Sequence, residues 1–261
     1  MQATNGLPKF LALAGSAIDT IKINKISRQT RDYRSVWVKE RRLGSRSLTQ
    51  CANLFFRLAN NPVKVVADIQ RWQRREVDSF NLVNGDQYSA AVEGPTAICI
   101  DALPGTDLDS LAKRNLIDSR VLQAAANELF RVHNLSSKKL RAPWSHGDPN
   151  MGNFIYDRKS HRARLIDFET VHLSRLSADE RHADDVSVFL LNLLGSVSDA
   201  DWPEMAKDFI TAYNRPRILG IVRRGLVMPL GIERLWWAIR TNYISGEALG
   251  KRLKKLHQIL S

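Results

Sequence analysis

Long hydrophobic runs, cysteine clusters and glycine-rich loops are all missing from this 261-residue sequence. A membrane-spanning helix needs about 20 apolar residues, and the longest apolar stretches, such as residues 186–195, are shorter. The apolar patch at residues 10–17 follows no basic run and is soon closed by charged residues, so we predict neither a signal peptide nor a span. The two cysteines, Cys51 and Cys99, lie too far apart for a metal-binding pair and favour a reducing compartment. We therefore expect a cytoplasmic protein.

Charge is distributed unevenly along the chain, which has a formal net charge of +12. Lys and Arg outnumber Asp and Glu by 15 to 4 in residues 1–75 and by 10 to 2 in residues 215–261, whereas residues 76–214 carry 14 basic and 21 acidic side chains. Basic surfaces attract phosphates, nucleic acids or anionic lipid headgroups. The basic ends therefore leave two interpretations open, a solvated face or a surface that binds an anionic partner.

Hydrophobic patterning changes near residues 100–106 of the chain. Before this point, alternation and helical spacing indicate strands and two helices, over residues 20–40, 46–59, 65–82, 88–92 and 96–102. After it, most of the chain has helical spacing, most clearly at residues 118–134 and 179–194. We predict an α+β fold with a strand-rich part at residues 1–102 and a helix-rich part at residues 103–261.

The densest group of polar residues among apolar ones lies in WSHGDPNMGNFIYDRKSHRARLID, residues 144–167. Asp148 lies between Gly and Pro, so we expect a loop with a restricted backbone, where a carboxylate can face a substrate. NFIY and ARLID have the character of two paired strands, which would bring Asn153 and Asp167 to the same end of a hairpin. An amide and a carboxylate oxygen suit Mg²⁺ bound together with nucleotide phosphates, and Asp148 beside them could accept a proton from a hydroxyl.

HGDPNMGN followed by IDFE resembles the catalytic loop and metal-binding motif of the protein-kinase-like superfamily. The resemblance is to its aminoglycoside phosphotransferase and choline kinase-like group and its lipopolysaccharide sugar kinases. The superfamily pattern is H-x-D-x-x-x-x-N followed by D-F-G or D-x-D, and His146, Asp148, Asn153 and Asp167 match it. The resemblance implies a two-lobed fold and an ATP-dependent kinase with Asp148 as catalytic base, Mg²⁺ on Asn153 and Asp167, and His146 supporting the loop. An ordinary buried hairpin with polar turns is the alternative.

Other parts of the family pattern are matched to different degrees. VWVK resembles the strand-lysine motif, which implies that Lys39 contacts the α- and β-phosphates, with Glu76 as its helix partner. An exposed lysine and a surface glutamate are the alternatives. Residues 41–75 form an insert between them that departs from the pattern. AICIDALPG resembles the connection between the lobes, where backbone groups from Ile100 to Ala102 would hold adenine.

One further part of the family pattern is missing, and another is ambiguous. KISRQTRDYRS, before VWVK, contains no glycine, which leaves Ser27, Arg28, Gln29 and Thr30 as unassigned candidates for contact with the phosphates. Asp184 or Asp185 resembles the helix aspartate that supports the catalytic loop, although an acidic residue near a helix N-terminus, favoured by the helix dipole, is an equal explanation. Glu169 takes the place of the glycine that protein kinases prefer, which favours small-molecule or lipid-linked sugar kinases.

The acceptor of the phosphate is not defined by these motifs. Residues 218–240 mix apolar and Arg residues in a way that suits a bilayer surface. This pattern motivates the hypothesis of a lipid-linked acceptor and of peripheral contact with the inner face of an anionic membrane. Core packing of the same residues is the simpler explanation of the pattern. A protein Ser/Thr kinase would need an A-P-E-like motif after IDFE, and the sequence has none. A catalytically silent pseudokinase, or a basic module that binds nucleic acid, is disfavoured by the intact motif residues and by the few aromatic residues among the basic runs.

Overall fold

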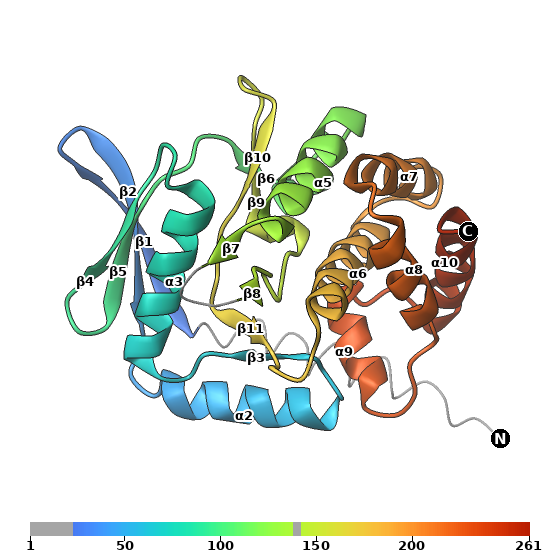
Figure 1. Ribbon diagram of the computed structural model, residues 1–261, viewed down its shortest axis with the longest axis horizontal. Helices are drawn as coiled ribbons and strands as arrows, with labels where there is room; N and C mark the ends of the chain where they lie inside the picture. Colours follow the sequence, from blue (N-terminus) through green and yellow to red (C-terminus); the bar gives the residue numbers. More distant parts are fainter. Residues whose placement is uncertain (1–22, 138–141) are drawn as a thin grey trace.

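The computed structural model describes residues 23–137 and 142–261, so the apolar patch at residues 10–17 lies outside the described residues. Strands gather at one end of the molecule and helices at the other, with short strand pairs between them (Figure 1). This mixed arrangement agrees with the α+β class predicted from the sequence. Within the described ranges, no helix combines the length and apolar character that crossing a membrane requires.

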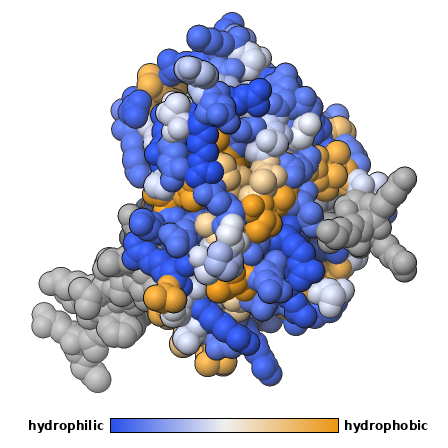
Figure 2. All heavy atoms as spheres, turned by 90° about the vertical axis from the view of Figure 1, so that its left-hand side faces the viewer, coloured by the Kyte–Doolittle hydropathy of each residue, from blue (hydrophilic) through white to orange (hydrophobic). Residues whose placement is uncertain are grey.

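A four-stranded antiparallel sheet occupies the strand-rich end. Its strands lie in the order β1-β2-β5-β4, with bounds β1 (Asn24–Arg31), β2 (Arg34–Arg41), β4 (Ala90–Glu93) and β5 (Ala97–Asp101). Asp32 and Tyr33 have φ angles of 47° and 62° and make the tight turn between β1 and β2. KISRQT thus continues as a regular strand where the kinase pattern has a glycine loop. From the side of this sheet, the surface is mostly hydrophilic with a hydrophobic area near its centre (Figure 2).

Two helices and a short strand separate β2 from β4. They are α2 (Ser45–Leu58), β3 (Val63–Val65) and α3 (Ile69–Asn84). The predicted helix start at residue 65 is wrong, because Val63 and Val65 are buried in β3, which pairs with β11 (Thr170–His172). The side chain of Asp68 then caps α3 by accepting a hydrogen bond from the backbone N–H of Arg71. The insert at residues 41–75 therefore reaches the segment that follows Asp167.

A three-stranded sheet in the order β10-β9-β6 lies in the middle of the molecule. Its strands are β6 (Thr106–Asp107), β9 (Phe154–Asp157) and β10 (Arg162–Leu165), and a smaller pair is formed by β7 (Ser136–Ser137) and β8 (Ala142–Pro143). Gly105 enters this sheet with a φ of 122°, and a Cβ atom there would lie 2.2 Å from the carbonyl oxygen of Tyr156. Only glycine allows the chain to pass so close to β9.

Seven helices fill the helix-rich end within the described residues. They are α4 (Leu108–Lys113), α5 (Ser119–His133), α6 (Ala178–Ser196), α7 (Trp202–Tyr213), α8 (Pro216–Gly225), α9 (Glu233–Arg240) and α10 (Gly246–Ile259). α6 begins with a capping box between Ser177 and Glu180, and its apolar residues are almost fully buried. The main core joins α5, α6 and α7 to the β9–β10 hairpin, and this packing fixes the loop that precedes β9.

Candidate active site

The loop from His146 to Asp148 is anchored to helix α6 by one buried carboxylate. Asp185 accepts hydrogen bonds from the backbone N–H groups of His146 (2.8 Å) and Gly147 (2.7 Å), and His133 Nε2 lies 3.0 Å away. Burial alone would raise the pKa of Asp185, but His172 and His133 hold that pKa well below its usual range. Of the two aspartates that the sequence left open, the structure places Asp185 at the loop. Asp184 instead bonds His172 Nε2 at 3.1 Å.

His146 braces the loop from inside. Its side chain is fully buried, with Nε2 2.9 Å from the carbonyl oxygen of Ile166 and Nδ1 accepting from the N–H of Asp148. Burial lowers the pKa of His146 to about 4, so the ring is neutral at pH 7. Gly147 has a φ of 93°, and a Cβ there would lie 3.0 Å from Thr170 Oγ1. The HGD sequence thus meets a steric requirement as well as a chemical one.

The β9–β10 hairpin brings Asn153 and Asp167 to the same end. The ladder pairs Leu165 with Phe154, and the N–H of Ile166 donates to the carbonyl oxygen of Asn153 at 3.0 Å. The side-chain amide of Asn153 donates to the carbonyl oxygen of Asp148 at 2.8 Å, which leaves its amide oxygen for another partner. Asp167 follows β10 with a φ of 64°, a left-handed conformation that Asp tolerates better than most residues.

Lys39 on β2 joins two acidic residues that are distant in sequence. Its Nζ lies 2.5 Å from Glu76 Oε1 on α3 and 2.7 Å from Asp167 Oδ1. The side chains of Lys39 and Glu76 are 7% and 1% exposed, so neither is the surface residue that the alternative interpretation allowed. Burial alone would lower the pKa of Lys39, but the charges of Asp167 and Glu76 outweigh it and raise that pKa. The ammonium is therefore charged, and it keeps the pKa of Asp167 below its usual value despite burial.

Glu169 and Arg75 also belong to this cluster, although no sequence pattern predicted their contacts there. Glu169 Oε2 lies 3.3 Å from Arg41 Nη2 and accepts from Asn24 Nδ2 at 2.8 Å. Arg75 Nε donates to the carbonyl oxygens of Phe168 and Thr170, both at 3.1 Å. Because these contacts join residues far apart in the chain, no local sequence pattern could have identified them.

The oxygen donors fit a divalent cation of the Mg²⁺ type. Asp167 Oδ1 faces Lys39, while Oδ2 makes no hydrogen bond within the described ranges, and neither does the amide oxygen of Asn153. Mg²⁺ commonly takes one or two protein oxygens and completes its shell with phosphate oxygens and water. Glu76, Asp167 and Glu169 also present oxygens within 4.8 Å of one another, but Lys39 already neutralises part of that group.

An apolar pocket of about 260 Å³ adjoins the Lys39 cluster. It is lined by apolar side chains around the Lys39, Glu76 and Asp167 side chains, namely Ile26, Trp37, Phe80, Ile100, Leu103, Ile155 and Ile166. Ile100 therefore reaches the pocket through its side chain. The N–H of Ala102 donates to the carbonyl oxygen of Ser35 at 2.9 Å, so that group is already used within the sheet. Among the described residues, the N–H of Leu103 has no hydrogen-bond partner.

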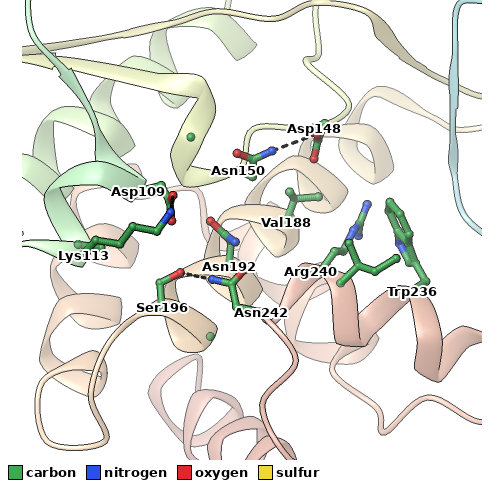
Figure 3. Close-up of a pocket in the computed structure, with 14 residues that line it drawn as sticks. Asp109, Lys113, Asp148, Asn150, Val188, Asn192, Ser196, Trp236, Arg240 and Asn242 are labelled. Carbon is green, nitrogen blue, oxygen red and sulfur yellow. Dashed lines mark hydrogen bonds and ion pairs between the residues drawn. The ribbon is translucent and has the colours of Figure 1, made fainter. Parts of the chain in front are cut away.

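A larger cavity of about 690 Å³, lined by both polar and apolar side chains, holds Asp148 in its wall (Figure 3). Asn150 Nδ2 donates to Asp148 Oδ2 at 3.1 Å. Burial raises the pKa of Asp148 to about 7, against the opposing charge of Arg240. The cavity also takes in Asn192 on α6 and Trp236 on α9. ERLWWAIR, the sequence of α9, showed the unusual mixture of Trp and Arg, but only tertiary packing places it beside Asp148.

Comparison with known proteins identifies no family for the chain. No family model matches it, and no curated protein matches its sequence. Among solved structures, it is similar to Plasmodium vivax ethanolamine kinase Pv091845, with 8% sequence identity, a TM-score of 0.44, and coverage of 95% of this chain and 85% of that one. A likeness of this size carries no argument about activity, which has to come from the geometry of the site.

Proposed function

We propose that this protein is an ATP-dependent phosphotransferase with a two-lobed, protein-kinase-like fold. The observation that carries the proposal is the buried Lys39 ammonium, which contacts Glu76 and Asp167 beside an apolar pocket. In the proposed arrangement, residues 1–102 form the nucleotide-binding lobe and residues 103–261 the catalytic lobe. The match of His146, Asp148 and Asn153 to the kinase loop supports it independently.

The apolar pocket has the size and lining expected for an adenine ring. Ile100 and the other aliphatic side chains would enclose the base, and Leu103 N–H would donate to it. Lys39 would then bind the α- and β-phosphates, with Glu76 keeping its ammonium in place. This proposal moves the hydrogen-bonding role predicted for Ala102 one residue along the chain, because Ser35 already occupies the N–H of Ala102.

Asn153 and Asp167 would hold Mg²⁺, which supplies positive charge to the transferring phosphoryl group when bound. Asp148 accepts the proton of the acceptor hydroxyl, whose oxygen forms the new bond to phosphorus as the bond to the ADP oxygen breaks. Asn153 connects the metal site to the base. Its side-chain nitrogen donates to the backbone carbonyl oxygen of Asp148, and its backbone carbonyl oxygen accepts from Ile166 N–H. The acceptor is a hydroxylated small molecule or a lipid-linked sugar.

ADP release from Mg²⁺–ATP in the presence of a mixture of hydroxylated compounds tests the proposal. Asp148→Asn keeps the shape of the side chain and removes the base, so turnover should fall by about 100-fold or more while ATP still binds. Asp157→Asn, at the far end of the same hairpin, is the matched control and should retain both. Unchanged turnover in Asp148→Asn would refute the assigned role.

Peripheral membrane contact is a separate part of this proposal. Leu54 and Leu58 on α2 and Val227 and Leu230 before α9 are between 58% and 78% exposed. α2 and α9 are in contact, since the centroids of the Phe56 and Trp236 rings lie 4.7 Å apart. Exposed leucines near arginines suit an anionic bilayer surface. Sedimentation with vesicles of phosphatidylglycerol, compared with phosphatidylcholine alone, checks this, and no difference between them would count against it.

A further inference from the structure

The cavity beside Asp148 has polar and apolar lining in nearly equal parts, and its polar side chains come from four separate segments. α4 contributes Asp109 and Lys113, α6 contributes Asn192, and α9 contributes Arg240. The remaining wall is the loop that carries Asp148. Figure 3 shows these side chains around one open space, with the tip of Arg240 directed to the side on which Asp148 lies. If Asp148 is the base, this space is where the acceptor must bind, so the inference rests on the proposed function.

Arg240 is the most unusual group in this wall. The residue is only 9% exposed, yet its hydrogen bond to Asp184 Oδ1 is long, at 3.3 Å. Its Nε and Nη2 atoms are buried without a hydrogen-bond partner in the described part of the chain. A buried guanidinium with unused donors is unfavourable unless an oxygen ligand fills them. Since neighbouring side chains cover these nitrogens, a ligand would reach them with a small shift of Arg240.

The rest of the cavity does not suit a cation. Asp109 is already paired with Lys113, 2.6 Å away on the same helix. The Arg240 guanidinium lies over the ring of Trp236, 4.7 Å from its centroid, and the same ring also contacts Phe56. An ammonium group would therefore find neither an unpaired surface of this ring nor the carboxylate of Asp109, and it would meet the charge of Arg240. Asp148 is the other carboxylate of the wall, and Asp184 pairs with only one nitrogen of Arg240. The unused donors Nε and Nη2 of Arg240 favour a ligand oxyanion.

Three carboxamide side chains in the cavity wall are placed to form hydrogen bonds with hydroxyl groups of a ligand. Asn192 Oδ1 accepts from the N–H of Met151 at 2.9 Å, which leaves its amide nitrogen as a donor. Asn242 Nδ2 donates to Ser196 Oγ at 2.5 Å, which leaves its oxygen as an acceptor. Asn150 lies next to Asp148 and is bonded to it. Donors and acceptors fixed in this way match the paired donor and acceptor character of hydroxyl groups.

We propose that the acceptor is a polyhydroxylated acid whose carboxylate or phosphate group binds Arg240. The carboxamides of Asn150, Asn192 and Asn242 hold its hydroxyl groups, and one hydroxyl lies at Asp148. A planar guanidinium binds either kind of oxyanion through two parallel hydrogen bonds. A carboxylate and a phosphate group share this chemistry, and the comparison of acceptors described next distinguishes the two.

The test uses sets of acceptors that share a sugar skeleton and differ in charge. For the glucose and galactose series, the members are the neutral sugar, the uronate, the 6-phosphate and the 2-amino sugar. Each is incubated with Mg²⁺ and ATP labelled with ¹⁸O at the γ-phosphate, and mass spectrometry identifies labelled products. We expect products from the uronates or the sugar phosphates. Arg240→Met should raise KM for these acids by about 10- to 100-fold, the value of a charged hydrogen bond, and Arg240→Lys should restore part of it.

Arg217→Met is the matched control, because Arg217 is 85% exposed on α8 and lies outside the cavity. Calorimetric binding of Mg²⁺–ATP verifies that each variant is folded and separates the two levels of the proposal. If the intact protein does not bind Mg²⁺–ATP, the proposed function fails. If it binds Mg²⁺–ATP but phosphorylates only neutral or amino sugars, or none of the acids, the acidic acceptor is refuted. An unchanged KM for the acids in Arg240→Met would also refute it.

Discussion

Gly195, in the core helix α6, packs closely against the end of α9, the helix that carries Arg240 and Trp236. Its replacement by alanine should disturb both stability and acceptor binding. A Cβ at Gly195 would lie 2.4 Å from the carbonyl carbon and oxygen of Thr241, at the end of α9. Ordinary contact begins at 3.4 Å, so the two helices would have to separate by roughly 1 Å at close-packed positions. Thr241 cannot move alone, because it is fully buried and its hydroxyl bonds the carbonyl oxygen of Trp237.

The energetic sign follows from two opposing effects. Alanine is favoured over glycine inside a helix by about 1 kcal/mol. Overpacking costs about 2–3 kcal/mol here, the upper part of its usual range, because the added carbon would meet backbone atoms of Thr241. We expect Gly195→Ala to lower the free energy of unfolding by about 1–2 kcal/mol. Gly250→Ala is the matched control: it lies inside α10 with nothing within 4 Å of the added carbon, so it should raise that free energy by about 0.5–1 kcal/mol.

Urea denaturation measures both variants, and ligand binding separates the local effect from the global one. Because α9 moves and the apolar pocket does not, Gly195→Ala should weaken acceptor binding more than Mg²⁺–ATP binding. A Gly195→Ala variant that is as stable as the intact protein, or that gains stability as Gly250→Ala does, would contradict the close approach of α6 and Thr241.

Two other perturbations probe the buried charges. Glu76→Gln removes the closest charged partner of Lys39, while Asp167 remains. We expect the free energy of unfolding to fall by about 1–3 kcal/mol, which is below the full cost of an unpaired buried charge. Calorimetry should show about tenfold weaker Mg²⁺–ATP binding, and unaltered binding would contradict the role of Glu76. Acidification should destabilise the fold, because burial lowers the pKa values of His146 and His182 to about 4 and about 3, so below the unfolded value near 6.5 the unfolded chain binds more protons. His146 alone accounts for about 3 kcal/mol between pH 7 and pH 4. Asp148, whose pKa burial raises to about 7, opposes this by a similar amount, because the native state then binds the extra proton. The loss of stability should therefore be largest in Asp148→Asn, and a melting temperature of that variant that is flat over this range would contradict the burial of His146 and His182 as neutral rings.

Local sequence patterns indicated the parts of the site that lie close together in the chain. The hairpin that joins Asn153 and Asp167 could be predicted, because its strands and turn are contiguous and the register follows from alternation. The choice between Asp184 and Asp185 could not be made, since neighbouring helical positions point about 100° apart and only packing selects the one that faces the loop. The pairing of Lys39 with Glu76 was predicted only through the family resemblance, because 37 residues separate them and their contact depends on where α3 lies on the sheet.

Long-range pairing explains what the sequence did not reveal. β3 is only three residues long and pairs with β11, more than a hundred residues away, so Val63–Val65 had too little local pattern to be distinguished from the start of a helix. Arg41 and Glu169 meet for the same reason, through the contacts of the insert with the segment after Asp167. The environment of Arg240 likewise depends on the packing of α9 against α6 and α2.

Calorimetric titration of ATP with and without Mg²⁺, into the intact protein and Asp167→Asn, tests the central claim most directly. Asparagine suits the positive φ of residue 167, so this variant changes the charge of the side chain and leaves the backbone conformation in place. The proposed phosphotransferase predicts binding that strengthens with Mg²⁺ in the intact protein and loses this dependence in Asp167→Asn. Absence of ATP binding in both proteins, or equal dependence on Mg²⁺ in both, would contradict the account.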